Sequence, residues 1–347
     1  MIRHFLPLLV AAPLVLAALA LQAADAPPAA AKFKLPATWE LSAPLIAPAA
    51  RPDDPYVSVK DPSVVFHDGL WHVFMTIRPK GYTPTVYTSF DKWENAAKAP
   101  QRQLALREKY FCAPQVFYFR PHKKWYLVYQ VGEPDRKLKG QPAFSTTETL
   151  GDPASWTKSQ LFFPDADPPS RTEGGLDYWI ICDDQKAYLF YTSLNGKLWR
   201  MWTPLKDFPK GFDHCEVALQ ADIFEASHTY RLKGFDQFLT VVEAGQSGRR
   251  YYTAYLADRL DGRWSPLADT EAKPFAGAAN VRPAEGVTLW TDNISHGELL
   301  RDGTDETMTV DPDRLRFVIQ GVLQKEKPPQ YGLIPWRIGM LTPAGLP

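Results

Sequence analysis

The sequence predicts an all-β fold, a five-bladed β-propeller, on the basis of three observations. Proline makes up 32 of the 347 residues, roughly twice its ordinary share, and a proline inside a helix removes a hydrogen bond and clashes with the preceding turn. The chain also contains 11 Trp, 15 Tyr and 19 Phe, residue types that favour pleated sheets. Finally, a pattern of a turn, an aromatic residue and alternating apolar residues recurs five times, and radially repeated four-stranded sheets form a propeller.

The copies of this pattern are spaced as one blade each. Each has an aromatic residue near its start: Trp71, Trp125, Tyr188, Phe238 and Phe317. Successive copies lie 54, 63, 50 and 79 residues apart, which leaves room for about four strands and their connections. A further Trp follows most copies after a strand and a short loop, at Trp93, Trp156 and Trp264. The alternative is a β-sandwich with accidental spacing, which five copies disfavour.

The N-terminal residues have the layout of a secretory signal peptide. Basic residues precede an apolar run from Phe5 to Leu21, and small residues follow it. A membrane anchor is the alternative, but the run is short for a span and contains Pro13. We therefore expect a signal peptide at 1–24, a flexible leader at 25–32 and a single propeller catalytic domain at 33–347. The mature protein would be secreted, to the periplasm or the outside, with no membrane attachment.

Charge and motif searches exclude several other classes of protein. The 39 Lys and Arg residues balance the 39 Asp and Glu residues, whereas a nucleic-acid partner requires a basic excess. The 3 cysteines have apolar neighbours and no CxxC or zinc-finger spacing, so we expect free thiols and no disulfide framework. The chain has no GxSxG, HExxH or phosphate-binding loop motif.

Three acidic residues are candidates for chemistry because they interrupt or precede apolar strands in separate repeats. They are Asp61 in VKDPSVV, Asp177 in GGLDYWII and Glu225 in DIFEAS. Any one alone could be a structural carboxylate that caps a turn, but a buried acid is costly without a purpose. Two carboxyl groups facing across a cleft suit hydrolysis of a glycosidic bond, and a third can raise the pKa of the acid.

Two other polar features remain open. His296, in NISHGE, could be a satisfied core histidine or a ligand to an ion in the propeller channel. Arg249 or Arg250 could contact a ligand, although a solvated turn is the simpler interpretation of this short basic pair.

Several segments closely resemble the family 62 glycoside hydrolases, which are α-L-arabinofuranosidases that remove arabinose branches from arabinoxylan. The matching motifs are KDPSVV from Lys60, APQVFYF from Ala113, WYLVYQ from Trp125, FEAS from Phe224, ISHGE from Ile294 and PWR from Pro335. The resemblance spans roughly residues 33–343. It implies a five-bladed propeller, inversion of configuration, secretion, and arabinoxylan or its oligosaccharides as the partner. We expect a monomer.

The resemblance also implies catalytic roles for the three acids. Asp61 would be the general base, Glu225 the general acid, and Asp177 the carboxylate that positions this acid and raises its pKa. Each lies in or beside a matching or repeated motif.

Substrate and ion contacts follow from the same resemblance. Lys60, Gln115, Tyr331 and Arg337 would contact the sugar, and His296 would be a ligand of a structural calcium ion in the channel. No organic cofactor is expected.

The chain departs from the family pattern after the WYLVYQ strand. It has Val131 where some relatives carry a Trp, and the charged insert from Glu133 to Lys139 follows. The way in which the xylan backbone is held there stays open. Two other functions are also open: a related five-bladed enzyme acting on β-xylosides or arabinan, and a non-catalytic propeller that binds polysaccharide.

Overall fold

Turn residues and alternating apolar residues fold the chain into antiparallel hairpins. A typical hairpin joins β2 (Val59–His67) to β3 (Leu70–Ile77) through only two residues, Asp68 and Gly69, which have φ values of 47° and 77°. Positive φ at both turn positions matches the twist of the flanking strands and explains the Asp-Gly sequence. On these strands the inward-facing residues are buried valines and aromatics, which accounts for the pairing register.

The computed structural model describes Met1 and residues 33–79, 82–108, 110–165, 167 and 174–345. The predicted signal peptide at 1–24 and leader at 25–32 therefore lie outside the described residues, apart from Met1. Residues Phe33–Pro347 form one compact unit. Within the described ranges, no helix has the length and apolar character needed to cross a bilayer.

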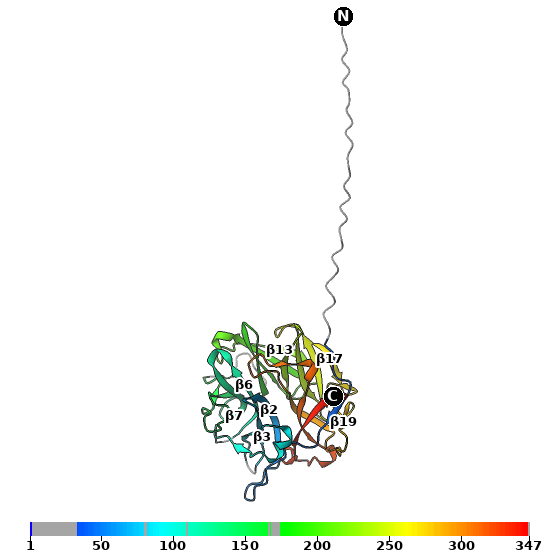
Figure 1. Cartoon of the computed structure of the whole chain (residues 1–347). Helices are drawn as coiled ribbons and strands as arrows, with labels where there is room; N and C mark the ends of the chain where they lie inside the picture. The colour runs from blue at the N-terminus through cyan, green and yellow to red at the C-terminus, as the bar shows by residue number, and fades with distance from the viewer. Residues whose placement is uncertain (2–32, 80–81, 109, 166, 168–173, 346–347) are drawn as a thin grey trace. The chain divides into compact units, whose positions relative to one another are not determined.

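In the described residues the strands form five sheets around a central axis, which confirms the predicted five-bladed propeller (Figure 1). Blade 1 consists of β2, β3, β4 (Thr85–Phe90) and β5 (Arg102–Gln103). Blade 2 consists of β6 (Phe111–Phe119), β7 (Lys124–Gly132), β8 (Gly140–Thr147) and β9 (Gln160–Leu161). Blade 3 consists of β10 (Leu176–Cys182), β11 (Lys186–Thr192), β12 (Lys197–Pro204) and β13 (His214–Gln220).

The last two blades contain additional short strands. Blade 4 consists of β14 (His228–Leu232), β15 (Phe238–Ala244), β16 (Tyr251–Ala257), β17 (Ser265–Thr270) and β18 (Lys273–Pro274), with β21 (Thr309–Val310) parallel to β14. Blade 5 has the order β19 (Val281–Pro283), β1 (Trp39–Leu41), β23 (Arg337–Pro343), β22 (Phe317–Val322) and β20 (Asn293–Leu299). The helical elements in the described ranges are short 3₁₀ turns: η1 (Trp93–Lys98), η2 (Arg120–His122), η3 (Leu205–Asp207), η4 (Pro312–Arg314), η5 (Gln324–Glu326) and η6 (Tyr331–Leu333).

The repeated aromatic position of the sequence lies on the second strand of every blade. Trp71 is on β3, Trp125 on β7, Tyr188 on β11, Phe238 on β15 and Phe317 on β22. The uneven spacing of the repeats is explained by the loops and by the extra strands of blades 4 and 5.

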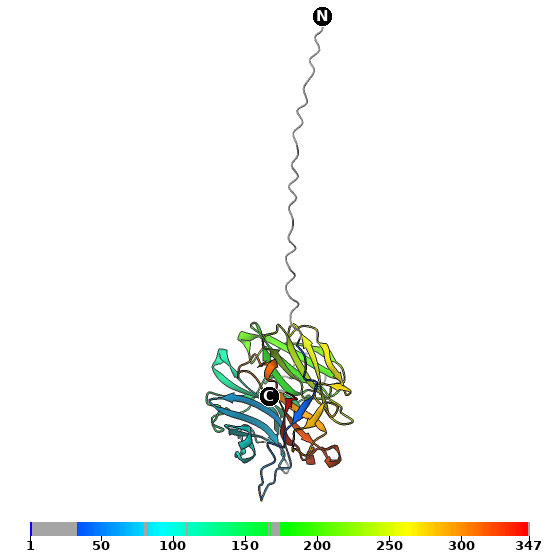
Figure 2. The ribbon, with the colours of Figure 1, turned by 45° about the vertical axis from the view of Figure 1, so that its right-hand side comes forward.

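Blade 5 is assembled from both ends of the described chain (Figure 2). β1 pairs antiparallel with β23 and parallel with β19, so an N-terminal strand lies inside the C-terminal sheet. Trp39 on β1 is fully buried, donates from Nε1 to the carbonyl of Phe275 at 2.6 Å, and has its ring centroid 5.3 Å from that of Phe275. This strand closes the ring of blades.

The core lies between neighbouring blades. Between blades 2 and 3, Phe208 lies with its ring centroid 4.5 Å from that of Phe119 and 5.2 Å from that of Tyr126. Between blades 4 and 5, the rings of Tyr252 and Phe317 meet edge to face at 4.9 Å. Contacts of this kind remove large aromatic areas from water and stabilise the ring of sheets.

Polar bonds near the axis tie each inner strand to the next. Ser63 Oγ of blade 1 accepts from Val116 N of blade 2 at 3.0 Å, and the Gln115 amide of blade 2 bonds the N–H and the carbonyl of Ile180 in blade 3. Trp179 Nε1 of blade 3 donates to Thr229 O of blade 4 at 2.9 Å, and His228 Nδ1 of blade 4 is 2.5 Å from Gly297 O of blade 5. Arg301, which follows β20, closes the circle because it donates to the carbonyls of Val64 and Val116 at 2.8 Å. The five inner strands are therefore connected into one ring.

Candidate active site

Bulges interrupt the inner strands at one level of the channel. In the described residues the pairing shifts register in the intervals Lys60–Ser63, Cys112–Gln115, Leu176–Trp179 and Ser295–Glu298. Positive φ values occur at Asp61 (52°), Ala113 (52°), Asp177 (53°) and Ala226 (50°). A bulge bends its strand and re-aims a side chain, and non-glycine residues with positive φ are strained and concentrate at functional sites. Asp61 and Asp177 occupy two of these positions, and Glu225 precedes a third.

Asp61 lies on β2 beside a lysine and a histidine. Its Oδ2 is 3.3 Å from Lys60 Nζ, and its Oδ1 is 3.3 Å from His296 Nδ1. Its backbone N–H donates to Gln320 Oε1 at 2.8 Å, which fixes the bulge. Burial opposes ionisation, but Lys60 and His296 outweigh it and hold the pKa of Asp61 below its ordinary value of 3.8. Asp61 is therefore a carboxylate at neutral pH, the form that a general base requires.

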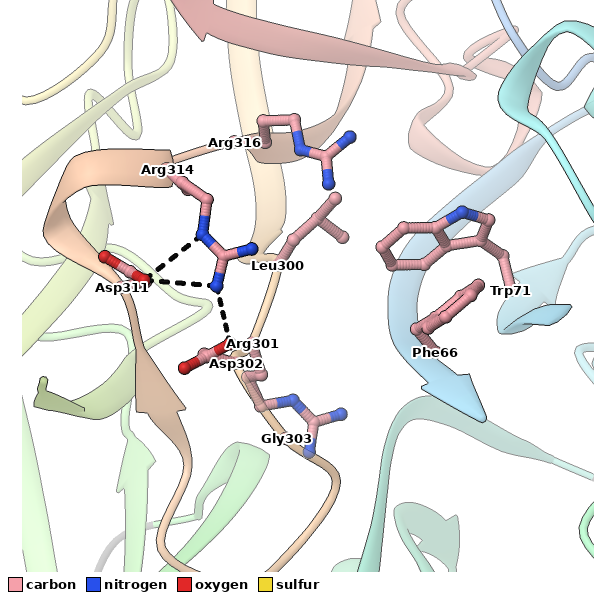
Figure 3. A pocket seen from close by; sticks show the side chains of 9 residues that line it. All are labelled: Phe66, Trp71, Leu300, Arg301, Asp302, Gly303, Asp311, Arg314 and Arg316. Carbon is pink, nitrogen blue, oxygen red and sulfur yellow. Dashed lines mark hydrogen bonds and ion pairs between the residues drawn. The ribbon is translucent and has the colours of Figure 1, made fainter. Parts of the chain in front are cut away.

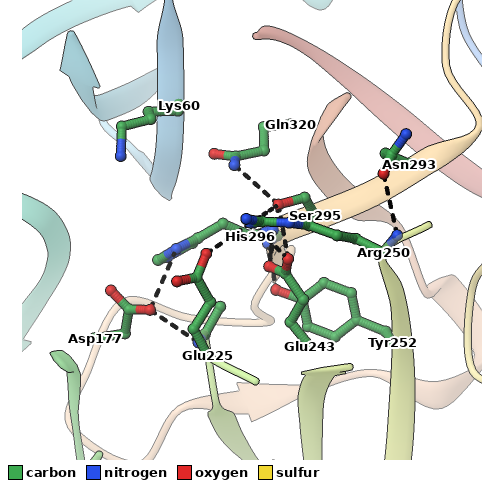
Figure 4. A network of polar contacts seen from close by, with 12 residues as sticks. Lys60, Asp177, Glu225, Glu243, Arg250, Tyr252, Asn293, Ser295, His296 and Gln320 are labelled. Carbon is green, nitrogen blue, oxygen red and sulfur yellow. Dashed lines mark hydrogen bonds and ion pairs between the residues drawn. The ribbon is translucent and has the colours of Figure 1, made fainter. Parts of the chain in front are cut away.

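Asp177 lies on β10 and faces the same ring nitrogen of His296 as Asp61 does (Figure 4). Its Oδ2 is 3.8 Å from His296 Nδ1 and accepts a 2.9 Å hydrogen bond from the backbone N–H of Ala226. Burial and then the charge of Asp61 raise the pKa of Asp177 to about 7. The bond to Ala226 fixes Asp177 relative to the residue that follows Glu225.

Glu225 lies just before β14, and its Oε1 accepts a 2.7 Å hydrogen bond from Arg250 Nη1. Burial raises the pKa of Glu225 above its ordinary value; Arg250 opposes this rise and Asp177 adds to it. Asp61 and Glu225 therefore have pKa values that are shifted in opposite directions, which is the arrangement expected of a base and an acid that act together.

A cavity adjoins this cluster on the side of Lys60. It has a volume of about 260 Å³, and its lining includes Lys60, Tyr110, Tyr331 and Trp336. Lys60 Nζ lies 5.5 Å from the ring centroid of Tyr331, which is half-exposed on η6. An aromatic face with a nearby ammonium group is a suitable surface for a small polyhydroxylated ring.

The family assignment follows from comparison with known proteins. The model of glycosyl hydrolase family 62 matches residues 42–342. This match includes strands of all five blades, although β1 precedes it, and it includes Asp61, Asp177 and Glu225. The chain belongs to glycosyl hydrolase family 62. The predicted resemblance is thereby confirmed.

Individual relatives agree with this assignment. The chain is 38% identical over 318 residues to alpha-L-arabinofuranosidase C of Cellvibrio japonicus, and the match covers 89% of this chain and 48% of that protein. The chain thus spans about half the length of this curated relative. The structure of the catalytic domain of a Coprinopsis cinerea GH62 alpha-L-arabinofuranosidase has 37% identity and a TM-score of 0.82, and the match covers 90% of this chain and 98% of that one. A GH62 hydrolase in complex with xylotriose has 37% identity and a TM-score of 0.80, covering 88% and 96% respectively.

Two residues of this family 62 chain that were predicted to bind the sugar, Gln115 and Arg337, make no contact with the carboxyl cluster among the described residues. Gln115 is buried, and its amide bonds the carbonyl and the N–H of Ile180 at 2.6 Å and 2.7 Å, so it joins blades 2 and 3. Arg337 lies over the ring of Trp290 at 5.3 Å and 3.6 Å from Glu326 Oε2.

Two residues of the site were missed or misread from the sequence. Glu243, fully buried on β15, accepts from Arg250 Nη1 at 2.9 Å and from His296 N at 2.8 Å. Its position in the apolar run VVEA is the same signal that identified Asp61, and could have found it. Of the basic pair, Arg249 is in an exposed pairing with Asp292, as a solvated turn predicts, but Arg250 is buried in the site.

The side chains around His296 do not match the ligand set of a calcium ion. Calcium takes six to eight oxygen ligands. Within the described ranges, no group of three or more His, Cys, Asp or Glu side chains could hold a metal ion. His296 Nδ1 faces the carboxylates of Asp61 and Asp177. These side chains do not by themselves supply the oxygen ligands that calcium takes, and the proposed reaction uses no ion in any step.

A second cavity, of about 320 Å³, lies at the opposite ends of the inner strands (Figure 3). Phe66 and Trp71 line one wall, and Arg314 on another wall pairs with Asp302 at 2.8 Å and Asp311 at 3.1 Å. The three predicted catalytic acids line neither cavity, but the cavity beside Lys60 is lined by the residue whose Nζ lies 3.3 Å from Asp61 Oδ2. The cavity beside Lys60 is therefore the one that the chemistry points to.

Proposed function

We propose that this chain is a secreted α-L-arabinofuranosidase that removes arabinofuranosyl side chains from arabinoxylan with inversion of configuration. The observation that supports it most directly is the pair Asp61 and Glu225, two carboxyl groups from different blades whose pKa values are shifted in opposite directions. The two relatives named above as α-L-arabinofuranosidases, and the xylotriose in another relative, support the substrate class.

In the proposed reaction, one water molecule is consumed and one glycosidic bond is broken. The Asp61 carboxylate accepts a proton from the water as the water oxygen bonds to the anomeric carbon. The bond between that carbon and the xylose oxygen breaks, and protonated Glu225 gives its proton to the departing oxygen. Asp177 holds the loop of Glu225 by accepting a hydrogen bond from Ala226 N–H. The negative charge of Asp177 also raises the pKa of Glu225 and so favours its protonated form.

The cavity beside Lys60 is the proposed arabinose site. The ammonium of Lys60 donates hydrogen bonds to the hydroxyl groups of the arabinose ring, and Tyr331 provides an apolar ring face with a phenolic hydroxyl at its edge. Lys60 also compensates the charge of Asp61, so the residue that binds the sugar keeps the base ionised.

The decisive experiment measures arabinose release from arabinoxylan together with NMR of the first anomer formed. We expect arabinose as the β-anomer first, because inversion places the water oxygen on the face opposite the leaving group. Arabinan and a xylo-oligosaccharide serve as comparison substrates. Initial formation of the α-anomer contradicts inversion, and faster release of product from arabinan or xylo-oligosaccharide contradicts the substrate.

Replacement of the proposed acid gives a sharper result. Glu225→Gln keeps the size of the side chain and its contact with Arg250 but cannot give up a proton. We expect arabinose release from arabinoxylan to fall about 10²–10⁴-fold with unchanged thermal unfolding, since general acid catalysis contributes on that order. Gln115→Ala is unsuitable as a control because it breaks a bond between blades; Arg249→Ala, on the exposed turn, should retain activity. Undiminished activity of Glu225→Gln contradicts the role.

The proposals that the protein is exported and that it binds calcium do not depend on the carboxyl groups. Export rests on the layout of residues 1–24, and is tested by N-terminal sequencing of protein from the culture medium and periplasm. Calcium binding at His296 rests on the family resemblance alone, and is tested by calorimetric titration of the chelator-treated protein with Ca²⁺.

A further inference from the structure

Glu243 is a buried acid that the reaction above does not use. It lies on β15 with no exposed surface, and its carboxylate receives hydrogen bonds from three groups. His296 N donates to Oε2 at 2.8 Å, Ser295 Oγ is 3.0 Å from Oε1, and Arg250 Nη1 donates to Oε1 at 2.9 Å (Figure 4). An ionised carboxylate with this many donors is well stabilised even when buried.

Arg250 is shared between two carboxyl groups. The same Nη1 that donates to Glu243 also donates to Glu225 Oε1 at 2.7 Å. Its guanidinium is held in place by aromatic faces, 4.6 Å from the ring centroid of Phe224 and 5.5 Å from that of Trp336. Because Arg250 cannot easily move, the two carboxyl groups compete for one positive charge.

The hydrogen bonds decide where the negative charge lies. Glu243 accepts from a backbone N–H and a hydroxyl in addition to Arg250, whereas Arg250 is the one donor recorded for Glu225 among the described residues. Glu225 also faces Asp177, Lys60, His296 and Tyr331. Burial raises the pKa of both acids, and Lys60 and His296 partly oppose this rise at Glu225. Because Glu243 accepts from three donors and Glu225 from one, Glu243 is the better site for the anion and Glu225 the better site for the proton.

We propose that Glu243 is a positioning residue that holds Arg250 and compensates its charge, so that Glu225 enters the reaction as an acid. Without this compensation, the full charge of Arg250 would act on Glu225 and stabilise its carboxylate form. This inference rests on the proposed function, because it assumes that Glu225 protonates the leaving group.

Leaving-group dependence tests the inference, because proton donation matters for a xylose hydroxyl and very little for a dinitrophenolate. The variant Glu243→Gln keeps the shape of the side chain and removes its charge. We expect kcat/KM on arabinoxylan to fall at least about 10-fold, and kcat/KM on 2,4-dinitrophenyl α-L-arabinofuranoside to fall less than about 3-fold. A purely structural role would lower both by the same factor, which overturns the inference, as does full activity on both.

Two further variants keep the test decisive. Ser295→Ala removes one donor to Glu243 without changing a charge, and should shift the ratio of the two kcat/KM values in the same direction by a smaller factor. It replaces Glu243→Gln as the test if that variant does not fold by circular dichroism. Tyr252→Phe removes a bond to Gly297 N in the same layer and leaves Arg250 and Glu243 untouched, so it should leave the ratio unchanged.

The wild-type enzyme separates failure of this inference from failure of the proposed function. If the wild type releases no arabinose from either substrate, the proposed function is wrong. If the wild type is active and the ratio is the same in Glu243→Gln, the function stands and the inference is wrong.

Discussion

Asp177 combines deep burial with the charge of a second carboxylate, and these two conditions have a consequence for stability as well as for catalysis. Burial and Asp61 raise its pKa to about 7 in the folded protein, whereas an unfolded chain has an ordinary value near 3.8. The folded protein binds this proton more tightly than the unfolded chain. The resulting stability is present below about pH 4 and is lost as the pH rises through about 7.

Asp177→Asn should therefore gain stability relative to wild type as the pH rises. A pKa difference of about three units corresponds to roughly 4 kcal/mol, and the coupling with Asp61 reduces the expected gain to about 2–3 kcal/mol above pH 7. Urea unfolding at pH 4.5 and pH 8 measures this difference. The amide of Asn can still accept from Ala226 N, so the fold is retained while arabinose release falls. An equal difference in stability at both pH values would contradict the assignment of a raised pKa to Asp177.

Single residues also show what the sequence can predict about the site. Asp61, Asp177, Glu225 and His296 were identified because each is a polar residue in an apolar strand, and the structure brings Asp61, Asp177 and His296 into one cluster that Asp177 extends to Ala226, next to Glu225. Their catalytic and metal-binding roles stay predictions.

The partners of these residues were not predictable in the same way. The sequence places Arg250 in a turn, and its burial results from the approach of Phe224, which precedes β14 in the same blade, and of Trp336, which precedes β23 in blade 5. Gln115 matches a family motif, but its amide is used by Ile180 of the next blade. Contacts between blades depend on non-local register, which local patterns do not contain.

At the scale of elements, the bulges of the inner strands position the site. In β20 the register shift surrounds Gly297, where the strand passes very close to β22. A Cβ atom at this position would lie 2.6 Å from Val318 O, 2.7 Å from Phe317 Cζ and 2.9 Å from Ile319 Cγ2. Only glycine allows this close approach, and His296 immediately precedes it.

Gly297→Ala should therefore weaken both the fold and the site. Overpacking of this kind costs about 1–3 kcal/mol, and the displaced β20 would move His296 away from Asp61 and Asp177. Thermal unfolding and arabinose release measure the two effects. Gly174→Ala is a matched control because an added Cβ meets no atom within 4 Å there. Equal stability of the two variants would contradict the close approach.

At the scale of the whole molecule, five repeats were predictable but the closure of the ring was not. The repeated aromatic residues marked one strand in each blade correctly, because alternation and turns are local, and the structure shows that it is the second strand. The segment before the first repeat contained no signal that β1 would lie between β19 and β23, since this pairing joins residues from opposite ends of the chain.

Trp39→Ala tests the closure. Its ring is fully buried against Phe275, and its indole N–H bonds the carbonyl of that residue. We expect a loss of about 3–5 kcal/mol in the free energy of unfolding, typical of a large aromatic side chain removed from a core. Leu289→Ala, at an exposed position, should cost less than about 0.5 kcal/mol. A similar small cost for both substitutions would show that β1 contributes little to closure.

The composition of blade 5 also determines when the protein can complete its fold during synthesis. Of the described strands, the ribosome makes β1 first and β23 last, yet both belong to the sheet that also contains the His296 strand. A nascent chain that stops before Arg337 leaves β1 and β22 with unpaired edges, which are templates for aggregation. Products truncated before β23 are therefore expected to aggregate, so synthesis must pass β23 before the active fold can form.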